Sequence, residues 1–373
     1  MRKARRCFQR AVVVLSILLM QLLVTLFVMT VNPSPLICRK EPYSVLPPDE
    51  HLITRETRGV HIPYTNCYDV LDNSSHVSRE SLVITCDNNT SYSRQTEFVS
   101  DSQPFSVPFK DPCLGLFIQQ HCYGRYRVPN VVHYVWFSRN VMDVFGFLSI
   151  LSVQRFLKPC VILVHADVLP HGPYWKHVLR LVPNIVHVHR QAPETIYGKR
   201  FGYVQHKSDI ARIELLTEYG GVYLDNDQLV LKSLDSFRNY SFVMGHENSN
   251  NLGNSLLISE KGAKFLDIWY KTYRSYNPKQ WGIHSTFVPF TLAKIYPTLI
   301  HIENESFIKP DLGGINQLYG GHYNWSNNYA VHLYTRWVKK FYTIQDLKYL
   351  NSSLGEISRL IMFGFATLCS DSN

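Results

Sequence analysis

Short apolar runs alternate with helix-spaced apolar positions along the middle of the chain. Buried strands are predicted at 131–137, 160–165 and 184–189, where apolar residues follow one another almost without interruption. Helices are predicted between them at 145–156 and 174–181. Strands that alternate with helices through short connections predict an α/β domain with a mainly parallel sheet.

The next helix carries clear boundary signals. It is predicted over 207–219, with Ser208 as its N-cap and Gly220-Gly221 at its end. Strands are predicted to follow at 222–224 and 228–231. Because ligands of such sheets bind at the carboxyl ends of the strands, the residues after 224 are the first place to look for a site.

Residues 11–31 form an uncharged and mostly apolar run. As a helix this run would span about 30 Å, the thickness of a bilayer core. The basic segment 1–10 should stay cytoplasmic as a short tail, so the rest of the chain would be lumenal. The alternative is a cleaved signal peptide, but its apolar region is typically shorter and no convincing cleavage site follows. We therefore expect a single-pass, type II transmembrane signal anchor.

The lumenal part divides into three segments by composition. Residues 32–127 are rich in Ser, Asn, Pro and Asp, and are expected to form a stem that ends in a partly ordered segment pinned by disulfides. The main folded domain, which would hold any catalytic site, is expected at 128–345. Apolar spacing over 347–365 predicts a packing helix within the C-terminal segment 346–373.

The net charge of +9 is concentrated at the N-terminus. Five of the positive charges lie within the first ten residues, so the remaining excess is small and no clustered basic face is visible. A nucleic-acid partner is therefore not expected.

Two features agree with a lumenal location. Triplets of the N-x-S/T type, the acceptors of N-glycosylation, recur along the chain. They begin at Asn73, Asn88, Asn89, Asn239, Asn304, Asn324 and Asn351. The cysteines beyond residue 10 show no zinc-type spacing, so disulfides are expected in an oxidising compartment. The plausible local pairs are Cys113 with Cys122 and Cys67 with Cys86. Because the count is odd, Cys38 beside the membrane is the candidate for a free thiol or a disulfide-linked homodimer.

Chemistry is most clearly indicated by Asp225-Asn226-Asp227, directly after the strand predicted at 222–224. Side chains alternate along a strand, so both carboxylates would project to one side if the extended conformation continued. Two such carboxylates can ligate Mg²⁺ or Mn²⁺, which prefer oxygen ligands and take the others from phosphate and water. A bare Asp-x-Asp is more often a solvated turn, so the triplet alone is a weak signal.

The preceding helix adds a second pair of charged residues. Asp209 and Arg212 lie three apart and so share a face of the helix. In the first helical turn, Asp209 could accept hydrogen bonds from sugar hydroxyls, while Arg212 could approach phosphate or orient a carboxylate. Their plain reading is a helix cap with an ion pair. The fixed order of helix, Gly-Gly, apolar strand and paired Asp is much more specific than either part.

Residues 208–227 resemble the nucleotide-sugar motif of glycosyltransferase family 32. This family includes the animal α-1,4-galactosyltransferases and α-1,4-N-acetylglucosaminyltransferases and the yeast initiating mannosyltransferases. Further segments are similar to the family over roughly 128–340: Val128 to Trp136 to its opening strand, Gln280 to His284 to its Trp-Gly-His segment, and Tyr329 to His332 to its Tyr-Ala-Val-His segment. Gly253-Asn254-Ser255 stands where the α-1,4 subgroup has Asn-Gly-Ala, and His284 lies one place later than in that subgroup.

The resemblance implies a GT-A-type fold, a nucleotide-diphosphate sugar donor, Mn²⁺ and retention of anomeric configuration. It also implies roles for single residues. Trp136 would stack on the nucleobase, with core packing as the alternative, and Asn254 would contact a sugar hydroxyl. His332 would be the third metal ligand beside Asp225 and Asp227, and His284 would contact donor or acceptor at the catalytic centre. The residues expected to bind the nucleotide sugar are Trp136, Asp209, Arg212, Tyr219, Gly221 and Asn254.

The resemblance thus predicts a metal-dependent retaining glycosyltransferase of the Golgi membrane. The expected donors are UDP-galactose or UDP-N-acetylglucosamine, and the expected acceptor is a glycan on a glycolipid or glycoprotein. No residue stands out as a nucleophile, which favours front-face transfer. A lumenal carbohydrate-binding protein without catalysis is the alternative from another class, and a nucleotide-sugar hydrolase is a third reading.

Overall fold

The structure is a computed structural model in which the chain separates into two units, 1–63 and 64–373. Everything described below lies in the second unit. The structure describes residues 67, 79–87, 91–99, 103–137 and 141–369. The predicted cytoplasmic tail and the membrane-spanning run at 11–31 lie outside these residues. Within the described part, no helix has the length and apolar character needed to cross a bilayer.

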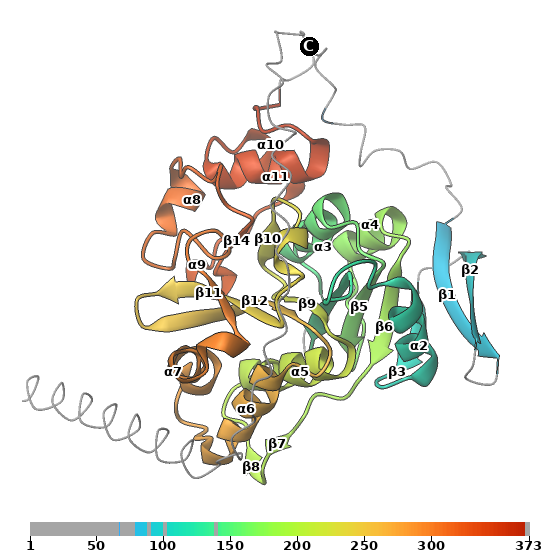
Figure 1. Cartoon of the computed structure of the whole chain (residues 1–373). Coiled ribbons are helices and arrows are strands. Elements are labelled where there is room, and N and C mark those ends of the chain that lie inside the picture. The colour runs from blue at the N-terminus through green and yellow to red at the C-terminus, as the bar shows by residue number, and fades with distance from the viewer. Residues whose placement is uncertain (1–66, 68–78, 88–90, 100–102, 138–140, 370–373) are drawn as a thin grey trace, which may run out of the picture. The chain divides into compact units, whose positions relative to one another are not determined.

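A mixed, mainly parallel sheet of eight strands forms the centre of the domain (Figure 1). Its strands, in spatial order, are β13 (His301–Glu303), β11 (Phe242–Asn248), β12 (Asn251–Ser259), β9 (Gly221–Leu224), β4 (Val131–Trp136), β5 (Val161–Ala166), β6 (Ile185–His189) and β3 (Phe105–Pro108). Only β12 runs antiparallel to its neighbours, β11 and β9. The predicted α/β domain with a mainly parallel sheet is therefore confirmed.

The connections place a topological switch in the middle of this sheet. Helices α3 (Val144–Phe156) and α4 (Pro173–Leu181) lead from β4 to β5 and on to β6, always in one direction. Helix α5 (Val204–Tyr219) then returns the chain to β9, on the other side of β4. In open α/β sheets the crevice at such a reversal binds ligands, because the loops that leave the two strands diverge there.

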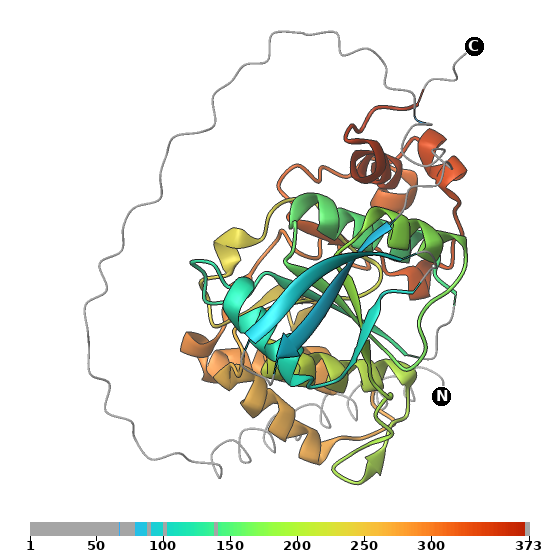
Figure 2. The same cartoon turned by 90° about the vertical axis from the view of Figure 1, so that its right-hand side faces the viewer.

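Both faces of the sheet are buried, which explains the unbroken apolar runs of its strands. Along β4, Val132 and Tyr134 enter the larger core with residues of α3 and α4, whereas Val131 enters a second core with residues of α2 (Pro112–His121) and the end of α5. In Figure 2 the ribbon of β1 (Arg79–Asp87) and β2 (Ser91–Val99) passes in front of α2 and this edge of the sheet. Leu82 and Ile84 of β1 complete the second core.

The folded domain begins earlier than the predicted boundary at residue 128. Strand β3, which the sequence reading assigned to the end of the stem, pairs in parallel with β6 as the last strand of the main sheet. The side-chain hydroxyl of Ser106 in β3 also hydrogen-bonds Nδ1 of His187 in β6. This strand was missed because a four-residue run with one buried Val gives too little periodicity to distinguish it from a loop.

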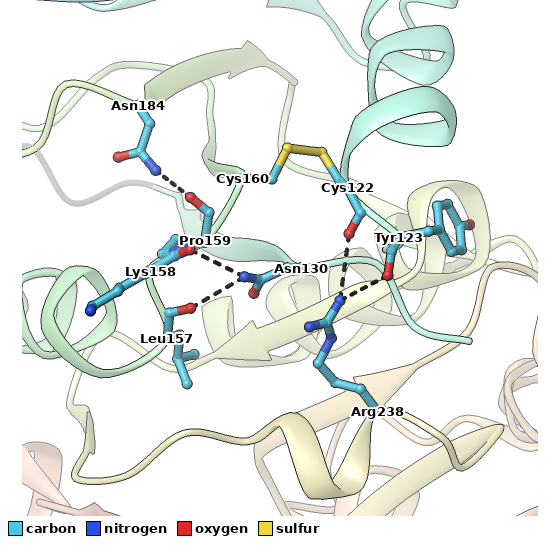
Figure 3. The surroundings of a disulfide bond; sticks show 9 residues. All are labelled: Cys122, Tyr123, Asn130, Leu157, Lys158, Pro159, Cys160, Asn184 and Arg238. Atoms are coloured by element: carbon cyan, nitrogen blue, oxygen red, sulfur yellow. Dashed lines mark hydrogen bonds between the residues drawn. A yellow bond between two sulfur atoms is a disulfide. The ribbon is translucent and has the colours of Figure 1, made fainter. Parts of the chain in front are cut away.

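The predicted disulfide pairs are wrong. The structure joins Cys67 to Cys369, Cys86 to Cys113 and Cys122 to Cys160. Spacing along the chain favours disulfides between cysteines that are close in sequence, but the pairing of strands in the sheet decides which cysteines meet. Asn130, directly before β4, accepts a backbone hydrogen bond from Cys160 and donates one to Cys122, so the end of α2 and the start of β5 lie side by side. Figure 3 shows the Cys122–Cys160 disulfide that joins them. Cys38, the predicted free thiol, lies outside the described residues.

The C-terminal segment forms two helices where the sequence predicted one over 347–365. They are α10 (Ile344–Tyr349) and α11 (Ser353–Phe363), and the apolar face of α11 joins the larger core. Ser352 caps α11, and Arg359 donates to the carbonyls of Leu347, Lys348 and Leu350 at the end of α10. These bonds satisfy the last carbonyls of α10 and so stabilise the break.

The remaining elements frame the site. They are β7 (Thr195–Ile196), β8 (Lys199–Arg200), β10 (Gln228–Val230), β14 (Ala330–His332), α6 (Lys264–Thr272), α7 (Val288–Ile295), α8 (Asn316–Gly320), α9 (Thr335–Val338), a π-helical turn at Ile283–Phe287 and short 3₁₀ turns at Asp235–Phe237, Tyr273–Ser275 and Pro297–Leu299. The predicted helix at 207–219 is α5, which starts three residues earlier. Ser208 is therefore inside the helix and is not its cap, whereas the predicted end at Gly220 is confirmed.

Gly221 is required by the close approach of β9 to β4. Its φ is 108°, and a Cβ at this position would lie 2.5 Å from the carbonyl oxygen of Val131. We expect Gly221→Ala to lower the free energy of unfolding by about 3 kcal/mol, because strained backbone and an unavoidable backbone contact add. Gly124→Ala, with φ of 59° but open space around the new methyl, should cost only about 1 kcal/mol. Denaturant titration compares the two, and equal losses would contradict the role of the strand contact.

Two fully buried histidines make the fold sensitive to acid. Nε2 of His133 donates to the carbonyl of Gly220 at 2.7 Å, so its Nδ1 accepts from Nε2 of His165 at 3.0 Å. Burial lowers the pKa of His133 to about 4, and burial together with the neighbouring His133 holds the pKa of His165 well below its ordinary value. Both rings are neutral when folded, whereas the unfolded chain binds protons below about pH 6.5.

The stability that depends on these neutral histidines is therefore fully present above about pH 6.5 and is lost as the pH falls toward 4. His133 alone should account for about 2 kcal/mol of lost stability at about pH 5. Denaturant titrations at neutral and acid pH measure the loss. His133→Gln should flatten this dependence, whereas replacement of the exposed His322 by Gln should leave it unchanged. An equally steep loss in His133→Gln would contradict the assignment.

Candidate functional site

The Asp225-Asn226-Asp227 triplet lies directly after β9, at the switch between β4 and β9. The extended conformation does not continue into it, contrary to the expectation from the sequence. The amide of Gln228 donates to the carbonyl of Asp225, which closes a turn, and the amide of Asp225 donates to the carbonyl of Ser255 on β12 at 2.8 Å. The turn, and not strand alternation, brings the two carboxylates to one place.

Asp225, Asp227 and His332 form a cluster of three metal-ligand types. One ligand atom from each lies within 4.8 Å of the others, and all three side chains are partly exposed. His332 arrives here because β14 pairs antiparallel with β10, where His332 stands opposite Gln228. Two carboxylates and an imidazole suit Mn²⁺, and the carboxylates alone suit Mg²⁺. The residues that the resemblance implied as metal ligands are thus brought together.

Asp227 is held in its ionised form. One of its oxygens accepts from the amide and the hydroxyl of Thr335, both at 2.9 Å, and the other lies 3.2 Å from Nε2 of His332. Burial alone would raise the pKa of Asp227, but His332 and the Thr335 hydrogen bonds hold it well below its usual range. In turn, burial opposes a charged His332, but Asp227 prevails and raises its pKa. As a metal ligand, His332 would be neutral.

Arg212 links the metal cluster to Asp209. Its guanidinium lies 3.3 Å from a carboxylate oxygen of Asp209 and 3.3 Å from one of Asp225, and it stacks 4.4 Å from the ring centre of Tyr223. Burial disfavours the charge, but Asp225 is foremost among the groups that raise the pKa of Arg212, which stays a cation. Of the two roles considered for Arg212, its contacts with both carboxylates favour the orientation of carboxylates. Tyr223 adds a second contact to Asp225, to which its hydroxyl donates at 2.6 Å.

Asp209 and Asn254 form a buried hydrogen-bonded pair beside Arg212. Nδ2 of Asn254 donates to Asp209 at 2.9 Å, and the Asn254 carbonyl accepts from Arg212. Asp209 lies in the second turn of α5, not in the first as predicted, because the helix starts earlier. Burial raises the pKa of Asp209 to about 6, although Arg212 opposes this. A carboxyl with this pKa can donate or accept a hydrogen bond near neutral pH.

Three predicted nucleotide-sugar residues have structural surroundings instead. Trp136 is 1% exposed and packs in the larger core against α3, so its ring face is not available to a base. The alternative reading of Trp136 as a core residue fits the structure. Tyr219 is buried in the second core, and its hydroxyl accepts from the amide of Lys110. Gly221 serves the contact between β9 and β4 described above.

His284 is buried among aromatic rings next to the pair of Asp209 and Asn254. Neither of its ring nitrogens has a hydrogen-bonding partner among the described residues, and its ring lies 4.9 Å from that of Tyr273. Burial, with His206 and Lys199 nearby, lowers its pKa to about 4. The adjacent Ser285 hydrogen-bonds Asp209. His284 is therefore neutral, and its nitrogens could accept a bond from a sugar hydroxyl or donate one.

Sequence reasoning missed four polar residues of the site. Thr335 and Tyr223 hydrogen-bond the two aspartates, as described above. Ser255 buries a hydroxyl, and Asn226 a carbonyl oxygen, that lack partners among the described residues. Tyr223 could have been found, because it lies on β9 only two residues before Asp225. Thr335 gave no signal, since only the pairing of β14 with β10 brings it to Asp227.

Part of the chain, including most of this site, is similar to known proteins. Residues 158–243 match the model of the glycosyltransferase sugar-binding region containing a DXD motif. The chain is 31% identical to glucan organizing enzyme 1 of Cryptococcus neoformans over 48% of this chain and 53% of that protein. It is 37% identical to the lactosylceramide 4-alpha-galactosyltransferase of Rattus norvegicus over 20% of each chain. It therefore spans about half, or less, of the length of these relatives.

Among solved structures, the galactosyltransferase LgtC in complex with donor and acceptor sugar analogs is similar to the chain, with 12% identity and a TM-score of 0.32. That similarity covers 64% of this chain and 97% of LgtC. Asp209, Arg212, Asp225 and Asp227 all fall inside the residues matched by the family model. The family model agrees with the resemblance found in the sequence, since residues 158–243 match the glycosyltransferase sugar-binding region containing a DXD motif.

Proposed function

We propose that this chain is a metal-dependent retaining glycosyltransferase with a GT-A-type fold. The observation that carries the proposal is the convergence of Asp225, Asp227 and His332 within 4.8 Å at the switch point of the sheet. Arg212 joins this cluster to the buried pair of Asp209 and Asn254. A metal site beside a buried hydroxyl-binding pair suits a diphosphate that carries a sugar.

In this proposal one group of residues acts on the diphosphate of the donor and another on its sugar. Asp225, Asp227 and His332 would hold the metal, which when bound neutralises charge on the departing diphosphate. Arg212 keeps Asp225 oriented, and Thr335 does the same for Asp227. Asp209, Asn254 and His284 offer hydrogen-bonding groups to sugar hydroxyls. The buried position of the Arg212 network limits reorganisation during the reaction.

The transfer step is proposed to occur on one face of the sugar. The acceptor hydroxyl oxygen forms a bond to the anomeric carbon while the bond from that carbon to the diphosphate oxygen breaks. The hydroxyl proton passes to the departing phosphate oxygen, so configuration is retained without a covalent enzyme intermediate. Trapping a glycosyl-enzyme during turnover would contradict this route.

The finer assignments follow the resemblance to glycosyltransferase family 32. We propose UDP-galactose or UDP-N-acetylglucosamine as donor, Mn²⁺ as the metal, and a glycolipid or glycoprotein glycan as acceptor. We also propose a type II Golgi membrane protein anchored by residues 11–31, which can form homodimers. The acceptor asparagines of the described part, Asn239, Asn304, Asn324 and Asn351, are all exposed, as a lumenal glycoprotein requires.

A donor screen tests the proposal. The full-length protein in detergent is incubated with a series of UDP- and GDP-sugars, with Mn²⁺ or with a chelator, and nucleotide release is measured. The expected result is UDP release from one donor class that depends on the metal. Binding of glycans without binding of any nucleotide sugar would favour the alternative, a carbohydrate-binding protein without catalysis.

A further inference from the structure

An exposed aromatic surface lies next to the metal cluster and has no role in the mechanism above. It is formed by Tyr203, Trp281 and Trp337, with Arg336 between the two tryptophans, and is called the Trp281 platform below. The three rings are 37%, 41% and 53% exposed. Large apolar rings grouped on a surface mark binding sites more often than chance exposure does.

The side chains of the Trp281 platform hold one another in place. The ring of Tyr203 meets that of Trp281 edge-on at 5.2 Å, and the ring of His206 stacks on Trp281 at 5.4 Å. The guanidinium of Arg336 lies 4.0 Å from the centre of the Trp281 ring and 5.3 Å from that of Trp337. Nδ1 of His206 hydrogen-bonds the hydroxyl of Tyr276 at 2.6 Å, which fixes the base of the group.

Arg336 offers hydrogen-bond donors that no described residue of the chain accepts. Among the described residues, no side chain or carbonyl accepts a hydrogen bond from its guanidinium. Its stacking on Trp281 still fixes the plane of these donors. A planar donor group beside aromatic rings suits a ligand with both hydroxyls and apolar C–H faces, which is the chemistry of a pyranose.

The platform is continuous with the proposed catalytic centre on two sides. Thr335, which donates twice to Asp227, directly precedes Arg336 in α9. Helix α5 carries His206 beneath the platform and Asp209 one turn further on. A sugar on the platform would therefore lie beside both the metal cluster and the proposed donor-sugar pair.

We infer that the Trp281 platform binds the neutral pyranose units of the acceptor glycan and sets acceptor specificity. This inference rests on the proposed function, since it assigns the second substrate of the same site. Tyr203 meets Trp281 edge-on, and the Arg336 cation lies between the two tryptophans. A polar cation among the rings suits a sugar better than acyl chains. The test below must therefore distinguish binding of a sugar to these rings from binding of the rings to a lipid surface.

The test compares Trp337→Ala and Trp281→Ala with the parent full-length protein in detergent. We expect the KM for a disaccharide acceptor to rise about tenfold or more in each, with the donor KM within about twofold of the parent value. Trp337→Phe should restore most of the acceptor affinity, because it keeps an aromatic face. The matched control is Tyr240→Ala, an exposed ring stacked on His301 of β13, which should change neither KM.

Binding without turnover gives an independent readout. Saturation-transfer NMR with lactose, cellobiose and methyl α-mannoside should show contact with the parent protein and lose it in Trp337→Ala, with no donor present. If the parent transfers no sugar, the proposed function fails, while this experiment still decides the platform. Equal acceptor KM in all variants would overturn the inference. So would loss of binding to phosphatidylcholine and phosphatidylserine vesicles with unchanged acceptor KM.

Discussion

Replacement of Asp227 by Asn is expected to reduce glycosyl transfer about a thousandfold. The carboxylate is one of two acidic groups in the cluster with His332, and it is held ionised by Thr335 and His332. The neutral amide keeps the shape and can still accept from Thr335, but it is a poorer metal ligand than a carboxylate, so the metal that would offset the charge of the departing diphosphate is held less tightly. A loss of metal assistance of about 4 kcal/mol corresponds to this factor.

Turnover of the variant is measured across a Mn²⁺ titration, beside its thermal unfolding temperature. Asp267→Ala removes a carboxylate from an exposed ion pair with Lys271 and serves as the matched control, with no expected change in turnover. Thr335→Val should lie between the two, because the backbone donor to Asp227 remains. Turnover of Asp227→Asn at the parent rate with chelator present would rule out the metal role of this residue.

Replacement of Arg212 by Met is expected to remove both nucleotide-sugar binding and about 4 kcal/mol of stability. The guanidinium is 3% exposed and contacts the carboxylates of both Asp209 and Asp225. Removing one member of a buried charge network leaves its partners unpaired. Such a loss typically costs about 3–5 kcal/mol, which is the range of the stability loss expected here. Asp225 also loses one of the two side-chain contacts that it makes among the described residues, because only the hydrogen bond from Tyr223 remains.

Arg238→Met is the matched control for Arg212→Met. Arg238 is equally buried, pairs with Asp235 and donates to the carbonyl of Val128, but it lies outside the site residues. Both variants should unfold at lower denaturant concentration, whereas only Arg212→Met should lose binding of the nucleotide sugar under conditions where both are folded. Calorimetric titration with the donor distinguishes them. Equal donor affinity in the two variants would show that Arg212 is a structural residue alone.

The elements that the sequence predicted well are those with strong local signals. Strands β4 and β5 are fully buried, β6 is buried except for its last residue, and all three are predominantly apolar runs. Helix α5 ends at Gly220-Gly221, as predicted. Strand β3 and the break between α10 and α11 were missed because short elements depend on partners that lie far along the chain. The local disulfide pairing failed for the same reason.

Local patterns along the chain were enough to predict the α/β class, the position of the two aspartates after a strand that begins with glycine, and the match of His332 to a family motif. The tertiary structure alone decided which side chains meet. A turn, not an extended strand, brings Asp225 and Asp227 together, because the amide of Gln228 closes onto Asp225. It also decided that Trp136 is a core residue, since alternation along β4 aims it at α3, and that Arg212 holds carboxylates. These outcomes depend on contacts between distant segments, which local patterns do not encode.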